Sequence, residues 1–227
     1  MDSNSDLLPA IDIETGEQPD ASVIWLHGLG ADGSDFVPVV PELGLRASLS
    51  VRFLFPHAPA IPITWNNGYV MPGWYDIFSL DEGRRHADEA GIRRTCAAVR
   101  ALIARENARG VPTHRIVLAG FSQGGAIAYI AGLTHPEPLA GIVALSTYIA
   151  APAMLDAERT PANAGTPVLA AHGIEDEVVP FALGTAAYDT VKAFGNPIDW
   201  HAYRMPHSVC IEEITQIGAW LNDRFTS

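Results

Sequence analysis

The stretch Gly120-Phe121-Ser122-Gln123-Gly124 decides how this chain folds. An apolar run rich in β-branched residues, Arg115-Ile116-Val117-Leu118-Ala119, precedes it, and a run of small, helix-compatible residues (125–131) follows. This succession predicts a strand, a tight turn and a helix, with the serine in the turn. Such a turn strains the serine backbone, and only glycine on both sides leaves room for it. We therefore expect an exposed serine hydroxyl above the edge of a sheet.

The rest of the chain alternates apolar runs of strand length with segments of helix length. Strands are predicted at 22–26, 52–55, 115–119, 141–145, 167–171 and 198–203. Helices are predicted at 88–109, 123–134, 181–194 and 209–225, the last with Ser208 as its N-cap. Strands that are apolar on both faces and separated by helices indicate a mostly parallel sheet with helices on both faces. We expect an α/β fold and a single domain over residues 1–227.

One segment, Pro56 to Asp76, does not fit this alternation. It holds four prolines, two glycines and four aromatic residues, and it is too long for an ordinary connection. Long loops of this kind usually lie over a functional site. The alternative is a flap with a purely structural role.

Composition limits the classes of partner. The chain has 227 residues and a formal net charge of -12, which repels nucleic acid and anionic membrane surfaces. Its first residues carry acid where a signal peptide carries Lys or Arg, and no apolar run is long enough to span a membrane. Cys96 and Cys210 are far apart and lack metal-type spacing. The sequence predicts a cytoplasmic protein with no membrane span, no nucleic-acid partner and two reduced thiols.

A serine hydroxyl becomes a nucleophile when an imidazole takes its proton and a carboxylate holds that imidazole. Of the eight histidines, His207 follows all the predicted strands and lies in a strand-to-helix loop. The acid should follow the strand 167–171, where Glu175, Asp176 and Glu177 are adjacent. The pattern favours Asp176 slightly and leaves the other two acids open.

The oxyanion of such a reaction needs two fixed N–H donors. Gln123 supplies one from the start of its helix, and the loop His27-Gly28-Leu29-Gly30, after the first predicted strand, supplies the other from Leu29. The same loop matches a dinucleotide-binding pattern, Gly-x-Gly-x-x-Gly, over residues 28–33. That interpretation fails because Pro38 and Pro41 interrupt the helix that would bind pyrophosphate. We expect no cofactor and no metal.

Taken together, these motifs resemble those of the acyl-protein thioesterase, phospholipase and carboxylesterase family of α/β-hydrolases, in its bacterial carboxylesterase branch. The resemblance covers nearly the whole chain. It rests on the following stretches: Trp25-Leu26-His27-Gly28-Leu29-Gly30, Pro56-His57-Ala58-Pro59, Asn66-Asn67-Gly68-Tyr69-Val70-Met71, Trp74-Tyr75-Asp76-Ile77, 115–128, Leu145-Ser146-Thr147-Tyr148, His172-Gly173 with Asp176, and His207-Ser208-Val209-Cys210.

The resemblance implies the α/β-hydrolase fold and a catalytic triad. By that similarity Ser122 is the nucleophile, Asp176 the orienting acid, and His207 the general base and then acid. The family's oxyanion donors correspond to Leu29 and Gln123. Residues that would border the acyl pocket are Trp65, Met71, Trp74 and Tyr148.

Three departures from the family pattern concern loops. Pro72-Gly73 stands where an Arg and a small residue are common, Pro206 replaces the glycine before the histidine, and Ile174 replaces an acid. None removes a catalytic group, so the expected difference lies in substrate preference.

These observations predict a serine carboxylesterase that hydrolyses short- to medium-chain acyl esters through an acyl-enzyme. An acyl-protein thioesterase or lysophospholipase of the same fold is the alternative, because pocket length is not readable from sequence. A hydrolase-fold binding protein without turnover is the rival from another class. The sequence leaves homodimer formation open.

Overall fold

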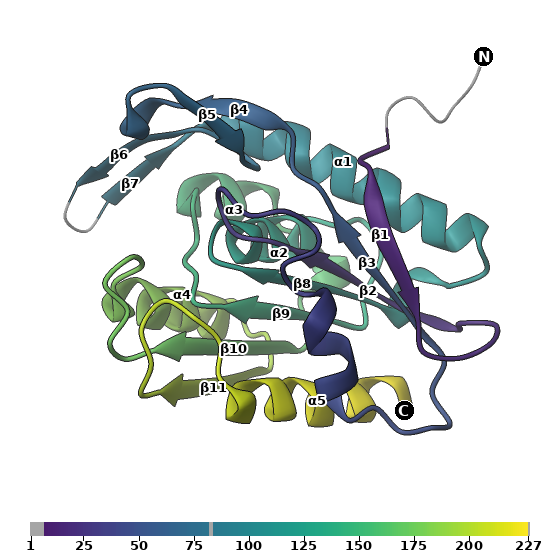
Figure 1. The fold of residues 1–227 in the computed structure, drawn as a ribbon. Coiled ribbons are helices and arrows are strands. Elements are labelled where there is room, and N and C mark those ends of the chain that lie inside the picture. The colour runs from purple at the N-terminus through teal and green to yellow at the C-terminus, as the bar shows by residue number, and fades with distance from the viewer. Residues whose placement is uncertain (1–6, 82–83, 227) are drawn as a thin grey trace, which may run out of the picture.

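The computed structural model describes residues 7–81 and 84–226 (Figure 1). It describes the side chains of these residues except within 80–86. Its centre is a sheet of seven strands in the order β1-β3-β2-β8-β9-β10-β11. β1 is antiparallel to β3, and all the other neighbours in this sheet are parallel. The strands, in chain order, are β1 (Ala10–Glu14), β2 (Ala21–Leu26), β3 (Val51–Pro56), β8 (Ile116–Phe121), β9 (Gly141–Leu145), β10 (Val168–Gly173) and β11 (Ile198–Tyr203).

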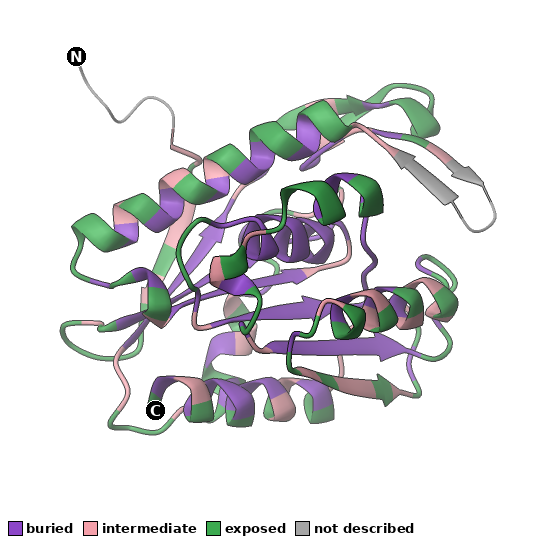
Figure 2. Ribbon diagram, turned by 180° about the vertical axis from the view of Figure 1, so that it is seen from behind, coloured by how far each residue is buried: buried purple, intermediate pink, exposed green. Residues whose placement is uncertain are grey.

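Helices cover both faces of this sheet. One face carries α1 (Glu89–Ala108), α2 (Gln123–Leu133), α3 (Pro152–Glu158) and α4 (Phe181–Ala193). The other carries the 3-10 helix η1 (Val37–Leu43) and α5 (Ile211–Thr226), which pack against each other. Two shorter 3-10 helices are η3 (Thr113–Arg115) and η4 (Pro161–Asn163). The strands β2, β3, β9 and β10 are buried along their whole length, as is α2 (Figure 2). The core therefore consists of two apolar layers, one on each side of the sheet.

The structure confirms the predicted fold class, and each predicted strand and helix is present. The bounds of β9 and β11 are the predicted ones. The predicted start of α5 was wrong, because the helix begins at Ile211 and its first turn closes where the Ile214 N–H donates to the Cys210 carbonyl. Ser208 lies before this turn and does not cap the helix.

The proline-rich segment 56–76 folds into a hairpin rather than a loose loop. Its strands β4 (Ala60–Ile63) and β5 (Tyr69–Pro72) are antiparallel and enclose η2 (Thr64–Asn66). The Asp76 carboxylate closes the base of the hairpin by accepting from the Thr64 amide at 2.7 Å and from its hydroxyl at 2.5 Å. A second antiparallel pair, β6 (Ile77–Asp81) and β7 (Arg84–Ala87), follows, and both pairs project from one corner of the fold (Figure 1).

No helix among the described residues has both the length and the apolar character that crossing a bilayer requires.

Candidate active site

Ser122 occupies the sharp turn between β8 and α2. Its backbone has φ 54° and ψ −119°, a conformation that non-glycine residues rarely adopt. A Cβ on Gly120 would overlap the main chain of Gly124, and a Cβ on Gly124 would overlap the carbonyl of Leu26. The turn therefore needs both glycines. Because β8 pairs with β2 and β9, the serine lies at the carboxyl end of the central strands.

His207 and Asp176 meet at the same carboxyl ends of the strands, in the loops after β11 and β10. The His207 Nδ1 lies 2.7 Å from the Asp176 Oδ2. The other carboxylate oxygen, Oδ1, accepts from the amides of Val178 at 2.9 Å and Val179 at 2.7 Å. Since a carboxylate accepts, the hydrogen lies on Nδ1 of the imidazole, and Nε2 is left as the basic nitrogen. This is the tautomer that a general base requires.

Burial separates the three adjacent acids that the sequence pattern could not separate. Asp176 is 6% exposed, whereas Glu175 and Glu177 are exposed. Burial alone would raise the pKa of Asp176, but the hydrogen bonds from His207 and from two amides outweigh it and hold that pKa below its usual value. The carboxylate is therefore charged at neutral pH, which favours its contact with the imidazole.

A second histidine lies beside this pair. The His172 Nε2 donates to the Val179 carbonyl at 2.9 Å, and α4 packs so closely on its ring that a Cβ on Gly184 would overlap it. Burial lowers the pKa of His172, so the ring is neutral at pH 7. It supports the loop that carries Asp176.

A cavity of about 250 Å³ opens at this edge and reaches both Ser122 and His207. The ring of Phe121 packs on the His207 imidazole with centroids 4.7 Å apart. Most of the wall is apolar. The full lining consists of Gly28, Leu29, Ala31, Asp35, Trp65, Ile77, Phe121, Ser122, Gln123, Tyr148, Val178 and His207.

Both residues expected to donate to an oxyanion line this cavity. Gln123 is the first residue of α2, and the first N–H groups of a helix have no acceptor within the helix. Leu29 belongs to the loop after β2, which faces the serine turn because β2 and β8 are neighbours.

The four residues expected to border the pocket divide into two pairs. Trp65 and Tyr148 line the cavity, but Met71 and Trp74 are not among its lining residues. Trp74 is 2% exposed, and its indole N–H donates to the His27 carbonyl at 2.7 Å. Sequence reasoning missed Ile77 and Val178. Ile77 ends the motif Trp74-Tyr75-Asp76-Ile77, and Val178 lies two residues after Asp176, so proximity to these motifs was the available signal.

Within the described part of the chain, no group of three or more His, Cys, Asp or Glu side chains could hold a metal ion. Cys96 is buried and Cys210 half-buried, and both are free thiols.

The sequence model of the phospholipase/carboxylesterase family matches residues 9–224. The chain belongs to this family. Acyl-protein thioesterase 1 of Neurospora crassa is 43% identical over 227 residues, covering 96% of this chain and 90% of the relative. Acyl-protein thioesterase 1 of Mycosarcoma maydis is 40% identical, covering 93% and 94%. Among solved structures, acyl-protein thioesterase 2 of Zea mays has a TM-score of 0.84 at 25% identity, covering 95% of this chain and 98% of that one.

Membership of the phospholipase/carboxylesterase family makes the chain a carboxylic ester or thioester hydrolase with the α/β-hydrolase fold. The expected enzyme class is thereby confirmed. The curated relatives are thioesterases, so they support the thioesterase alternative better than the carboxylesterase that the sequence favoured.

Proposed function

We propose that this protein is a serine thioesterase of the acyl-protein thioesterase type, which hydrolyses the thioester between an acyl chain and a protein cysteine. The observation that carries the proposal is the 2.7 Å contact between His207 and Asp176 at the edge of a cavity that also contains Ser122. The names of the fungal relatives, which are all acyl-protein thioesterases, point to the same substrate class.

In the proposed acylation step, the Ser122 hydroxyl attacks the thioester carbonyl while the His207 Nε2 takes its proton. The amides of Leu29 and Gln123 stabilise the oxyanion, and one such donor lowers the barrier by roughly 3 kcal/mol. The C–S bond then breaks, and the imidazolium returns the proton to the departing thiolate. Asp176 keeps the imidazole oriented throughout.

In deacylation, water takes the place of the hydroxyl. His207 removes a proton from the water, and the hydroxide adds to the Ser122 ester. The second tetrahedral intermediate then collapses to a free fatty acid, and the imidazolium returns the proton to the departing Ser122 oxygen. The apolar wall of the cavity, to which Leu29 and Tyr148 contribute, suits an acyl chain because each buried methylene stabilises the complex by about 0.8 kcal/mol.

Replacement of the nucleophile tests the proposal. Ser122→Ala should lower turnover of an S-acylated peptide and of a p-nitrophenyl ester by a factor on the order of 10⁶, with an unchanged circular dichroism spectrum. Ser146→Ala is the matched control, because Ser146 also has a positive φ (45°) and directly follows the neighbouring strand β9. It should keep its turnover and its labelling by a fluorophosphonate. Turnover near the wild-type rate in Ser122→Ala would refute the assignment.

A matched pair of peptides, one S-acylated on cysteine and one O-acylated on serine, separates the thioesterase from a carboxylesterase. We expect a higher kcat/KM for the S-acyl peptide. A clear preference for the O-acyl peptide, or for small oxygen esters, would return the assignment to the carboxylesterase that the sequence favoured.

A further inference from the structure

A short segment, residues 72–75, lies between the two proposed oxyanion donors. It begins with the last residue of β5 and leads towards β6, and it contains the Trp74-Tyr75 pair of the sequence motif. Hydrogen bonds join it on one side to the loop after β2 and on the other to the first residue of α2. The two donors therefore share one support, although about ninety residues separate Leu29 from Gln123 in the chain.

On the first side, the segment binds the residues before and after Leu29. The Trp74 indole N–H donates to the His27 carbonyl at 2.7 Å, and the Gly30 N–H donates to the Pro72 carbonyl at 2.8 Å. A Cβ on Gly73 would come within 3.0 Å of the Leu29 side chain, so glycine lets that side chain lie close against the segment. The position of the Leu29 amide thus depends on where residues 72–74 lie.

The His27 ring braces the same loop from inside. Its Nδ1 lies 2.7 Å from the Gly28 carbonyl, so it carries the hydrogen, and its Nε2 accepts from the Ala58 amide at 3.1 Å. Burial lowers the pKa of His27, which keeps this neutral form at pH 7. The ring of Trp74 packs on it with centroids 4.9 Å apart.

On the second side, the side-chain amide of Gln123 binds two consecutive residues of the segment. Its Oε1 accepts from the Trp74 amide at 2.8 Å, and its Nε2 donates to the Tyr75 carbonyl at 2.8 Å. Gln123, Trp74 and Tyr75 are all buried. Gln123 is therefore attached to the segment by its side chain, while its main-chain N–H is the second proposed donor.

Trp74 is the residue at which these contacts converge. Its indole binds one loop, its amide binds Gln123, and its carbonyl accepts from the Thr95 hydroxyl of α1. It is 2% exposed and does not line the cavity, so it is not placed to contact an acyl chain.

We propose that Trp74 is a positioning residue that sets the separation of the Leu29 and Gln123 amides. The proposal rests on the proposed function, since it concerns the oxyanion of that reaction. Both amides must lie 2.7–3.1 Å from the oxyanion, and a displacement of about 1 Å costs about 100-fold in rate. Disturbing Trp74 should therefore slow the chemical step and leave substrate binding nearly unchanged.

Trp74→Phe tests this, because it keeps an aromatic ring and removes the N–H that binds His27. With a p-nitrophenyl ester we expect kcat to fall about 10- to 100-fold and KM to change less than about 3-fold. The affinity of a trifluoromethyl ketone, which forms an oxyanion on the serine, should fall by a similar factor. The affinity of the matching alcohol, which forms none, should not change.

Trp65→Phe is the contrasting variant, because Trp65 lines the cavity. It should change KM, with an effect that depends on acyl-chain length, and leave kcat nearly as in the wild type. If Trp74→Phe behaved in this way, Trp74 would be a pocket residue and the proposal would be overturned.

Thr95 gives a second test that does not depend on the folding of Trp74→Phe. Thr95→Val removes the hydroxyl that binds the Trp74 carbonyl, so kcat and ketone affinity should fall together, by several-fold, and Thr95→Ser should restore both. Unchanged kcat in a folded Thr95→Val would overturn the proposal. A wild-type protein that neither turns over esters nor reacts with a fluorophosphonate would instead refute the proposed function, whatever the variants do.

Discussion

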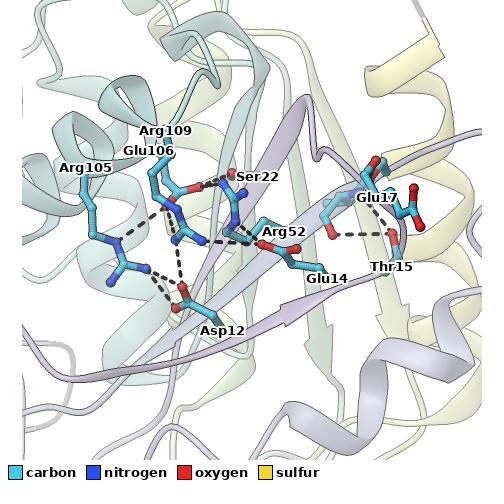
Figure 3. A network of polar contacts seen from close by, with 11 residues as sticks. Asp12, Glu14, Thr15, Glu17, Ser22, Arg52, Arg105, Glu106 and Arg109 are labelled. Atoms are coloured by element: carbon cyan, nitrogen blue, oxygen red, sulfur yellow. Dashed lines mark hydrogen bonds and ion pairs between the residues drawn. The ribbon is translucent and has the colours of Figure 1, made fainter.

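The two ends of the central sheet use buried carboxylates in opposite ways. At the amino ends of β2 and β3, the completely buried Glu106 accepts from the Ser22 hydroxyl at 2.7 Å, from Arg52 at 2.8 Å and from Arg109 at 3.0 Å (Figure 3). At the carboxyl ends, Asp176 accepts from two amides and binds one histidine, His207, which faces a cavity.

The difference lies in what each carboxylate binds. Glu106 forms ion pairs with Arg52 and Arg109, and Asp12 and Glu14 of the edge strand β1 pair with the same arginines and with Arg105 (Figure 3). The network joins β1, β2, β3 and α1. None of its residues lines the cavity at Ser122 and His207. Asp176 instead binds an imidazole that faces the cavity, and in the proposed mechanism it orients that base. Under this proposal one end of the sheet contributes to stability and the other to catalysis.

A third carboxylate belongs to neither pattern. Glu213, in the first turn of α5, is completely buried, and neither of its oxygens accepts a hydrogen bond of ordinary geometry from the described residues. Burial raises its pKa to about 8, an effect that the nearby Cys210 amide offsets only in part. Unlike Asp176, it is therefore protonated at pH 7.

The largest expected effect is a loss of turnover from a change at the carboxyl ends of the strands. Asp176→Asn should lower kcat about 10⁴-fold, because the amide stabilises the wrong tautomer of His207. Steady-state kinetics on a p-nitrophenyl ester measure this. The matched controls are Glu175→Gln and Glu177→Gln, which change exposed acids in the same loop and should stay close to the wild-type rate. A large loss in either control, with a mild one at Asp176, would move the role to that neighbour.

At the other end, Glu106→Gln should act on stability alone. Removing the charge leaves Arg52, whose side chain is 7% exposed, with one carboxylate instead of two, and we expect a loss of about 3 kcal/mol in the free energy of unfolding. Urea denaturation measures it. The half-exposed partner gives the control, since Glu14→Gln should cost less than about 1 kcal/mol. A lowered kcat in folded Glu106→Gln would show that the two ends are coupled.

The last effect is a change in stability with pH. Because the pKa of Glu213 is raised from 4.5 to about 8 on folding, the native state binds more protons than the unfolded chain in that interval. Its contribution to stability is complete below pH 4.5 and declines as pH rises to about 8, by at most about 1.4 kcal/mol per pH unit. Glu213→Gln, which imitates the neutral acid, should remove this decline. Denaturation at several pH values measures it, and parallel curves for variant and wild type would contradict the shift.

An element of the fold could be predicted from the sequence when its pattern lay within a few neighbouring residues. The serine turn was predictable because its five-residue pattern lies between a strand-like run and a helix-like run, although the contact that requires Gly124 is with the distant Leu26 carbonyl. β9 was predictable because it is uniformly apolar. β1 was missed although Ile11-Asp12-Ile13-Glu14 alternates as a half-exposed strand does, because the run is short. The hairpin β4–β5 was hidden by its prolines, which are tolerated there because the pair lies outside the central sheet.

The candidate site divides in the same way. Ser122 and His207 were identified by motif and by order along the chain, and their catalytic roles stay predictions, as do the single domain, the cytoplasmic location and any homodimer. Trp74 was expected at the pocket because the resemblance to the family implied that this loop borders the acyl pocket. Its main-chain amide and its indole instead donate hydrogen bonds to Gln123 and His27, which come together only in the folded protein.

By itself, the sequence determined the layered α/β architecture and the serine turn, because periodicity and turn chemistry act over a few residues. It also predicted the order in which nucleophile, acid and base follow one another along the chain. Only the tertiary structure decided which of three neighbouring acids binds the histidine, which aromatic side chains face the cavity, and which buried glutamate has partners. Those outcomes depend on burial and on contacts between residues far apart in the chain, and no local pattern records them.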